Sequence, residues 1–146
     1  RGKCKDPRMP SRRRVDPAAG LAAVHAWSAG SGAQADSGGP VIDRDVVALA
    51  VRFSLEELGV RAPGRSVEVR VPPHGVVQCV EGTTHRRGTP PNVVETDADT
   101  WLSVVTGRMR WEQAWDSGRL MVSGTRADLT AYLPLIVLPP TADREG

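Results

Sequence analysis

Three glycines divide the stretch from residue 95 to residue 129 into short elements of different kinds, and this division constrains the fold more than any other feature. Thr96, with Asp99 three residues later, has the pattern of a capping box and predicts the start of a helix. Apolar residues then follow at helical spacing as far as Gly107, which can end the helix with a positive φ. A second, shorter run with the same spacing ends at Gly118. The sequence therefore predicts two short helices in succession.

The same stretch continues with a pattern typical of a strand. Residues 120–123 alternate in polarity and stop at Gly124, which predicts a short strand followed by a turn. After the turn, Thr125 or Asp128 could cap a last helical turn that leads to Leu133.

Two longer helices are predicted upstream. Asp16 can cap a first helix whose first residue is Pro17, and its apolar side, Leu21, Val24 and Trp27 with two alanines, leads to Gly30. A small-residue linker follows up to residue 40, so we expect this helix to dock only loosely on the rest of the chain. The second helix is capped by Asp43 and keeps helical spacing as far as Gly59.

Three short strands are predicted between these helices and residue 95. Val67, Val69 and Val71 alternate with charged residues, which indicates a half-buried strand. Residues 76–80 and 92–95 form the second and third strands, separated by a loop rich in glycine and proline. With the strand at 120–123, the body is predicted to be an α+β domain, a small and mainly antiparallel sheet with helices packed on one face.

The order of these residues resembles the sterol carrier protein 2 superfamily, in its divergent actinobacterial subgroup. The resemblance covers roughly residues 46–135 and includes the upstream stretch APGRSVEVRVPPHGVVQCVEGTTHRRGTPPNVVETD. One departure is Thr125 after Gly124, where many members have Asp or Asn. The series that carries the resemblance is Trp101, Leu102, Gly107, Met109, Ala114, Trp115, Gly118-Arg119-Leu120, Val122 and Gly124.

The resemblance implies non-enzymatic binding or carriage of a fatty acyl or sterol-like lipid in an apolar tunnel between the helices and the sheet, with no cofactor. The head-group candidates are Arg86, Arg87 and Arg119, and the segment from residue 133 to 138 could cover the open end of the tunnel. The apolar pocket candidates are Trp101, Val105, Met109, Trp111, Trp115, Leu120, Val122 and Leu133.

Two other functions remain open. The first is an accessory module for protein interaction or dimerisation, with a filled core and no ligand. The second is an enzyme that uses Cys79, His85 and Glu95, although nothing in their spacing requires catalysis and we assign no catalytic residue. His74, His85 and Cys79 fit no metal-site spacing, so no metal site is predicted.

Charge and composition limit the partners. Residues 1–16 hold seven basic residues against two acidic ones, so with a total of +2 the remaining chain carries −3. This balance argues against nucleic acid as a partner of the body, because such proteins present a basic face to phosphates. The basic arm Arg12-Arg13-Arg14 is predicted to be solvated, and its functional alternative is contact with nucleic acid or with anionic lipid, the latter as a transient contact with a membrane.

The predicted organisation is a disordered basic leader (1–16), a helix with its linker (17–40), a sterol-carrier-like domain (41–138) and a tail (139–146). No apolar run reaches the 18 to 20 residues or so that span a bilayer. With only two cysteines, we expect a cytoplasmic protein, either monomer or homodimer. Lysine occurs only at Lys3 and Lys5, so Met9 is a candidate for the natural start.

Overall fold

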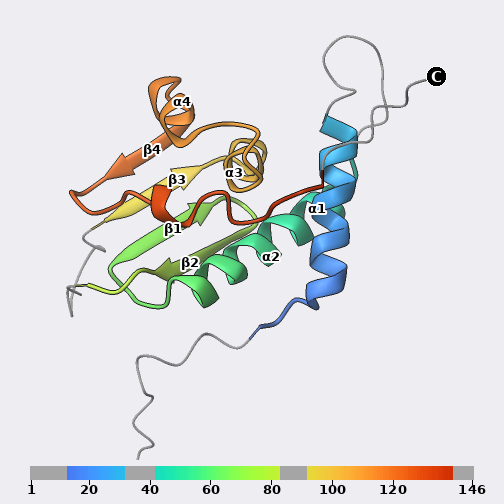
Figure 1. The fold of residues 1–146 in the computed structure, drawn as a ribbon, viewed down its shortest axis with the longest axis horizontal. Coiled ribbons are helices and arrows are strands. Elements are labelled where there is room, and N and C mark those ends of the chain that lie inside the picture. The colour runs from blue at the N-terminus through green and yellow to red at the C-terminus, as the bar shows by residue number, and fades with distance from the viewer. Residues whose placement is uncertain (1–12, 32–41, 83–91, 140–146) are drawn as a thin grey trace, which may run out of the picture.

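The computed structural model describes residues 13–31, 42–82 and 92–139 (Figure 1). The predicted loop at 83–91 and most of the linker before residue 42 lie outside these ranges. In chain order the elements are α1 (Pro17–Ser31), α2 (Arg44–Arg61), β1 (Val67–Val71), β2 (Gly75–Cys79), β3 (Val93–Thr96), α3 (Ala98–Val105), α4 (Trp111–Asp116), β4 (Leu120–Ser123) and the 3₁₀ turn η1 (Thr130–Tyr132).

The four strands form one sheet in the order β2-β1-β3-β4. β1 and β2 pair as an antiparallel hairpin, with Val69 opposite Val77. β3 pairs with β1 in parallel, with Val94 beside Val69. β4 then returns antiparallel to β3, with Val122 opposite Val94. Two of the three pairings are antiparallel, so the sheet is mixed but mainly antiparallel.

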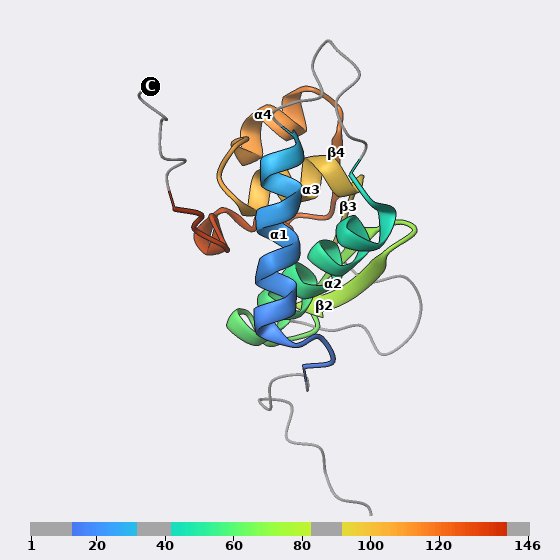
Figure 2. The ribbon, with the colours of Figure 1, turned by 90° about the vertical axis from the view of Figure 1, so that its right-hand side faces the viewer.

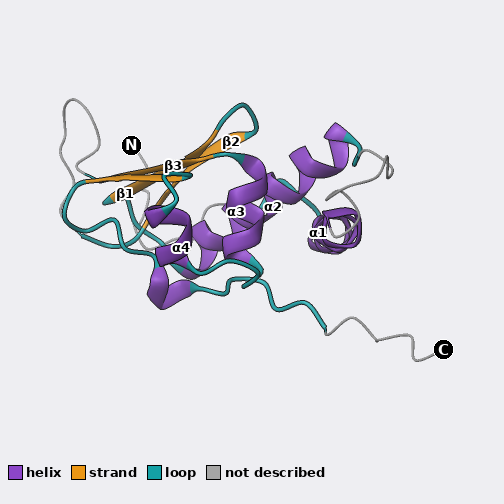
Figure 3. Ribbon diagram, turned by 90° about the horizontal axis from the view of Figure 1, so that it is seen from above, coloured by secondary structure: helices purple, strands orange, loops and turns teal. Residues whose placement is uncertain are grey.

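The helices lie on one side of this sheet, and none of the described elements covers the other face, which we call the open face (Figure 3). Alternation along β1 sends Val67, Val69 and Val71 toward the helices, where each is at most 1% exposed. The charged residues Glu68 and Arg70 point to the open face and form an ion pair there. This arrangement confirms the predicted α+β class and the gathering of helices on one face.

α1 packs against α2 at one end of the molecule, beside the other helices (Figures 1 and 2). Val24 and Trp27 are at most 1% exposed, and the Trp27 indole N–H donates to Asp99 Oδ1 of α3 at 3.2 Å. The Arg108 guanidinium lies 5.0 Å from the centre of the same ring. The expectation of loose docking is therefore wrong, because α1 buries its apolar side in the common core.

The apolar side of α1 also differs in detail from its prediction. Leu21 is 39% exposed, whereas Gly20 is buried against Phe53 of α2. A glycine allows the two helix backbones to approach closely, and apolar spacing alone does not show where such an approach occurs. The buried side of α1 consequently runs through Gly20, Ala23, Val24 and Trp27.

The helix starts follow the predicted chemistry with one shift. Asp43 caps α2 by accepting the Asp45 N–H at 2.8 Å, as expected. α3 is capped by Asp97, whose Oδ1 accepts the Thr100 N–H at 2.8 Å, and not by Thr96. Thr96 is the last residue of β3, and its hydroxyl donates to the Arg119 carbonyl at 2.8 Å across the sheet. Pairing with β4 thus keeps Thr96 extended and moves the cap by one residue.

The predicted last helical turn is present as η1. Asp128 Oδ1 accepts the Thr130 N–H at 2.9 Å, so Asp128 stabilises its start and Thr125 does not. Only three residues adopt the 3₁₀ conformation before the chain extends at Leu133.

Candidate functional site

A cleft of about 330 Å³ lies where the end of α3, the start of α4 and the C-terminal segment meet. Most of its wall is apolar, and the polar groups that it contains come from the start of α4 and from η1. Its lining residues are Val104, Gly107, Met109, Arg110, Trp111, Glu112, Thr130, Leu133 and Pro134.

The backbone around Gly107 gives the cleft its shape. Gly107 has φ of 80° and ends α3, which turns the chain so that Met109 N–H can donate to the Ser103 carbonyl at 3.1 Å. The C-terminal segment is attached to the same helix end, because the N–H groups of Leu135 and Ile136 both donate to the Val105 carbonyl, at 2.9 and 3.0 Å. The cleft is thus formed between two backbone segments that are fixed to the last turn of α3.

Trp111 is the most informative residue of the cleft. Its side chain is only 4% exposed, and its indole N–H has no hydrogen-bond acceptor among the described residues. An unpaired buried donor costs about 1–3 kcal/mol, so native structures rarely leave one without a partner. A water or a ligand with an acceptor atom would remove this cost, which makes Trp111 a candidate anchor for a ligand.

Two charged residues accompany Trp111 at the start of α4. Arg110 precedes it and is exposed, and its backbone N–H donates to the Gln113 side-chain oxygen at 3.1 Å. This bond fixes the backbone at the helix start, and the Arg110 guanidinium has no acceptor within the described part of the chain. Glu112 is exposed on the same side of the cleft, so the charge there is balanced.

The residues predicted to form the pocket are divided among three environments. Met109, Trp111 and Leu133 line the cleft. Trp101, Val105 and Leu120 are at most 1% exposed in the packed core, and Val122 is half-buried against that core. Trp115 is 53% exposed on the outer side of α4.

The predicted head-group residues lie elsewhere or outside the described residues. Arg119 is exposed and does not line the cleft, and Arg86 and Arg87 lie outside the described ranges. Arg110 was missed by the sequence analysis. The sequence did offer a signal for Arg110, because it directly precedes the pocket candidate Trp111 and a polar group near one residue would also be near the other.

The space between the sheet and the helices is occupied by side chains. Trp101 extends from α3 into this layer and its indole N–H donates to Ser54 Oγ of α2 at 2.8 Å. Leu58 and Leu102 fill the space beside it and are at most 1% exposed. The space between α3 and the sheet is therefore filled by core side chains, and the cleft lies at the end of α3.

The residues of the enzyme alternative do not come together where the structure describes them. Cys79 faces the helices opposite Val67 and is fully buried, whereas Glu95 lies beside Arg70 on the open face. Burial raises the pKa of the Cys79 thiol from 9.0 to about 12, which disfavours the reactive thiolate. His85 lies outside the described residues.

Two further searches of the described ranges bear on the kind of site. Within them, no group of three or more His, Cys, Asp and Glu side chains could hold a metal ion. Among the helices of the same ranges, none is long and apolar enough to cross a membrane.

The fold and the cleft together define an α+β protein of the sterol-carrier type. Residues 43–135 match the sequence profile of a family described as bacterial SCP ortholog, and the chain belongs to that family. This membership confirms the resemblance that the ordered residues of α3, α4 and β4 carry, and it suggests a lipid-binding role in general terms. The comparison with curated proteins gave no match. α1 and the segment before it precede the matched residues.

Proposed function

We propose that this protein binds a hydrophobic ligand, fatty acyl or sterol-like, in the cleft at the end of α3 and carries it without chemical change. The unpartnered indole N–H of Trp111 carries this proposal, because Trp111 lines a mostly apolar cleft and its buried N–H would gain an acceptor from a ligand with an apolar body and one acceptor group. Family membership supports the class of ligand.

The polar residues of the cleft favour a particular head group. Trp111 offers one donor, and the Arg110 guanidinium beside it offers several more in a fork that suits a carboxylate. Met109, Leu133 and Pro134 would then contact the apolar part of the ligand. The volume of about 330 Å³ is near the lower end of ligand pockets, which favours partial enclosure of a single chain over enclosure of a large lipid.

The test is direct binding of a fluorescent fatty acid, together with native mass spectrometry and lipid extraction of the protein purified from cells. We expect Trp111→Phe and Arg110→Gln each to weaken fatty-acid binding about fivefold to tenfold, since each removes a hydrogen bond worth about 1–1.5 kcal/mol. Trp115→Phe and Arg119→Gln are matched controls, because both residues are exposed and neither lines the cleft.

A clean apo mass without fatty-acid or sterol binding at micromolar concentration would contradict the proposal. Equal loss in the control variants would instead show that the affinity is not specific to this cleft.

One observation favours the interaction-module alternative. Val76 and Met121 are 59% and 60% exposed on the open face of the sheet, and no other described element covers them. They stand on the two edge strands with Arg70 and Glu95 between them, so a partner on this face would span the sheet from one apolar contact to the other. Light scattering during gel filtration would reveal a homodimer through this face, and Met121→Lys would then dissociate it.

A further inference from the structure

A second cleft, of about 590 Å³, lies between α2 and the edge strand β2 and is formed by different elements from the first cleft. Its walls are the segment that precedes α1, the outer side of α2, and the turn that begins β2. The lining residues are Arg14, Val15, Asp16, Leu49, Arg52, Leu55, Glu56, His74, Gly75, Val76 and Val77.

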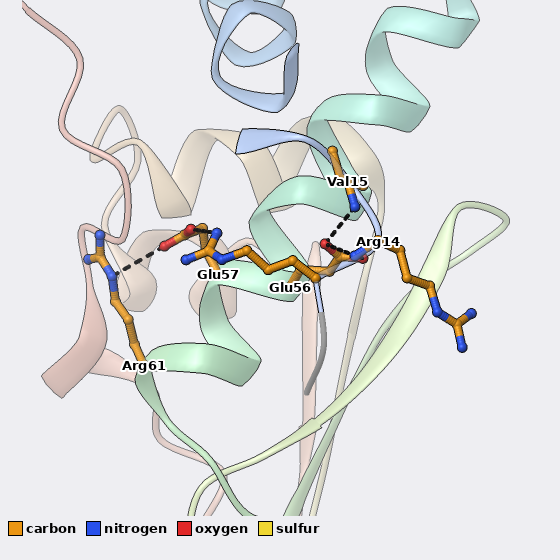
Figure 4. A network of polar contacts seen from close by, with 6 residues as sticks. Arg14, Val15, Glu56, Glu57 and Arg61 are labelled. Carbon is orange, nitrogen blue, oxygen red and sulfur yellow. Dashed lines mark hydrogen bonds and ion pairs between the residues drawn. The ribbon is translucent and has the colours of Figure 1, made fainter. Parts of the chain in front are cut away.

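The segment before α1 is held in place by a carboxylate of α2. Glu56 accepts the backbone N–H of Arg14 at 3.0 and 3.1 Å and that of Val15 at 3.0 Å (Figure 4). The neighbouring Glu57 forms ion pairs with Arg13 and with Arg61. Arg14 and Val15, which the sequence analysis places in the leader, therefore belong to one wall of the cleft.

The two carboxylates that line the cleft are already used as acceptors. Glu56 is bound by the two backbone N–H groups of the segment, and Asp16 Oδ2 accepts the Ala19 N–H at 3.1 Å at the start of α1. Both acidic side chains that line the cleft therefore accept hydrogen bonds from the backbone and hold it in position.

The cations of the cleft are not committed in the same way. The Arg14 side chain extends away from Glu56, and its guanidinium has no acceptor among the described residues (Figure 4). Arg52 makes one long bond, from Nε to the His74 carbonyl at 3.4 Å. The unused hydrogen-bonding capacity of the cleft consequently includes the donors of two guanidinium groups, and such groups bind carboxylate, sulfonate and phosphate oxygens well.

The floor of the same cleft is apolar. Leu55 is 3% exposed, and Leu49, Val15 and Val77 are half-buried around it. A ligand that satisfies both the floor and the arginines needs an apolar body and an anionic group at one end. The volume of about 590 Å³ is in the middle of the range for small-molecule sites.

We propose that this cleft is a second ligand site, separate from the cleft at Trp111, that binds a small organic anion with an apolar ring or chain. Arg14 and Arg52 bind the anionic group, and Leu49 and Leu55 contact the apolar part. The proposal does not depend on lipid binding at the end of α3, because the two clefts share no residue.

The test compares two dyes that differ by one anionic group. Anilinonaphthalene sulfonate has an apolar ring system and a sulfonate, and N-phenylnaphthylamine has the same ring system without the sulfonate. We expect the double variant Arg14→Gln with Arg52→Gln to weaken binding of the sulfonate dye about tenfold or more, since two charge-assisted contacts are lost. Binding of the uncharged dye should change less than about twofold.

The matched control is Arg119→Gln with Arg126→Gln, which changes the net charge equally at exposed positions outside both clefts. Amide chemical shifts locate the dye, and we expect changes at Val15, Leu49 and Val77. Because Arg14 and Arg52 are exposed, their substitution should leave the fold intact, which the same spectra verify.

Three results would overturn the proposal. The first is unchanged binding of the sulfonate dye in the double variant, and the second is equal weakening in the control. The third is a loss in the double variant of binding to vesicles that contain phosphatidylglycerol, without loss of dye binding, which would assign these arginines to a membrane surface.

Discussion

Two buried tryptophans, Trp101 and Trp111, differ in whether the indole N–H has a hydrogen-bond partner. The Trp101 N–H donates to Ser54 Oγ at 2.8 Å, and Ser54 in turn donates to the Val51 carbonyl. Trp111 has no such partner among the described residues, although it is nearly as buried. The first indole therefore belongs to the core, and the second is the better candidate for a ligand contact.

Cys79 provides a prediction of pH dependence. Its pKa of about 12 in the folded protein exceeds the ordinary value of 9.0, because burial disfavours the thiolate. Above pH 9 the unfolded chain loses the thiol proton while the folded protein keeps it, so this contribution to stability is complete below pH 9 and declines as the pH rises toward 12. The free energy of unfolding should fall by about 1 kcal/mol from this group between pH 8 and 10.

Urea unfolding at both pH values, with Cys79→Ala as the comparison, isolates this effect from other titrating groups. The stability difference between the two proteins should shrink by the same amount at pH 10. If the stability difference between the two proteins did not change with pH, the prediction that the Cys79 thiol is buried would be contradicted. Rapid labelling of Cys79 by a thiol reagent under native conditions would contradict it as well.

At the scale of single elements, local chemistry specified most boundaries. Glycine after a helical run ends α3 and α4 where expected, with φ of 80° at Gly107 and 77° at Gly118. The α3 cap moved from Thr96 to Asp97, because pairing of β3 with β4 competes for Thr96 and capping rules do not include that pairing.

Because α1 and α2 approach closely, we predict that a glycine-to-alanine substitution in α1 lowers the stability of the protein, the opposite of its usual effect in a helix. Alanine normally stabilises a helix relative to glycine by about 0.5–1 kcal/mol. At Gly20, however, an added Cβ would lie 2.3 Å from Cγ and 2.6 Å from Cβ of Phe53, which is itself only 5% exposed. Overpacking of this kind costs about 1–3 kcal/mol, so we expect Gly20→Ala to destabilise the protein by about 1–2 kcal/mol.

The measurement is the urea midpoint of Gly20→Ala, with Ala26→Gly as the control for helix propensity at an exposed position of the same helix. A higher midpoint for Gly20→Ala would show that α1 moves away from α2 easily and would contradict the close packing.

At the scale of the whole molecule, the question is whether α1 shares one hydrophobic core with the rest of the described chain. The matched family begins at residue 43, yet Trp27 of α1 is buried and donates to Asp99 of α3. The prediction separates residues 17–40 from the following domain. In the structure the buried core includes α1 and so extends beyond the matched residues.

Hydrogen exchange can test this continuity. We expect the amides in the middle of α1 to exchange as slowly as those of α2, because both helices should open only when the common core opens. The C-terminal end of α1 serves as an internal control for fraying. Fast exchange throughout α1, with α2 still protected, would show that α1 is an independent appendage.

The sequence by itself determined the elements of this protein and its family. Hydrophobic periodicity, capping residues and glycine stops are local signals, and they placed the four α-helices and the four strands of the described ranges to within about two residues, whereas the start of η1 was left open between Thr125 and Asp128. The inward alternation of Val67, Val69 and Val71 likewise follows from the period of a strand.

Only the tertiary structure decided which apolar residues fill the core and which border a cleft. Trp101, Trp111 and Trp115 are equivalent by composition, but one is in the core, one lines the cleft and one is exposed. The clefts arise where Gly107 and Pro134 meet and where Glu56 binds the segment before α1. Such contacts join residues far apart in the chain, and their geometry depends on the packing of all the elements at once.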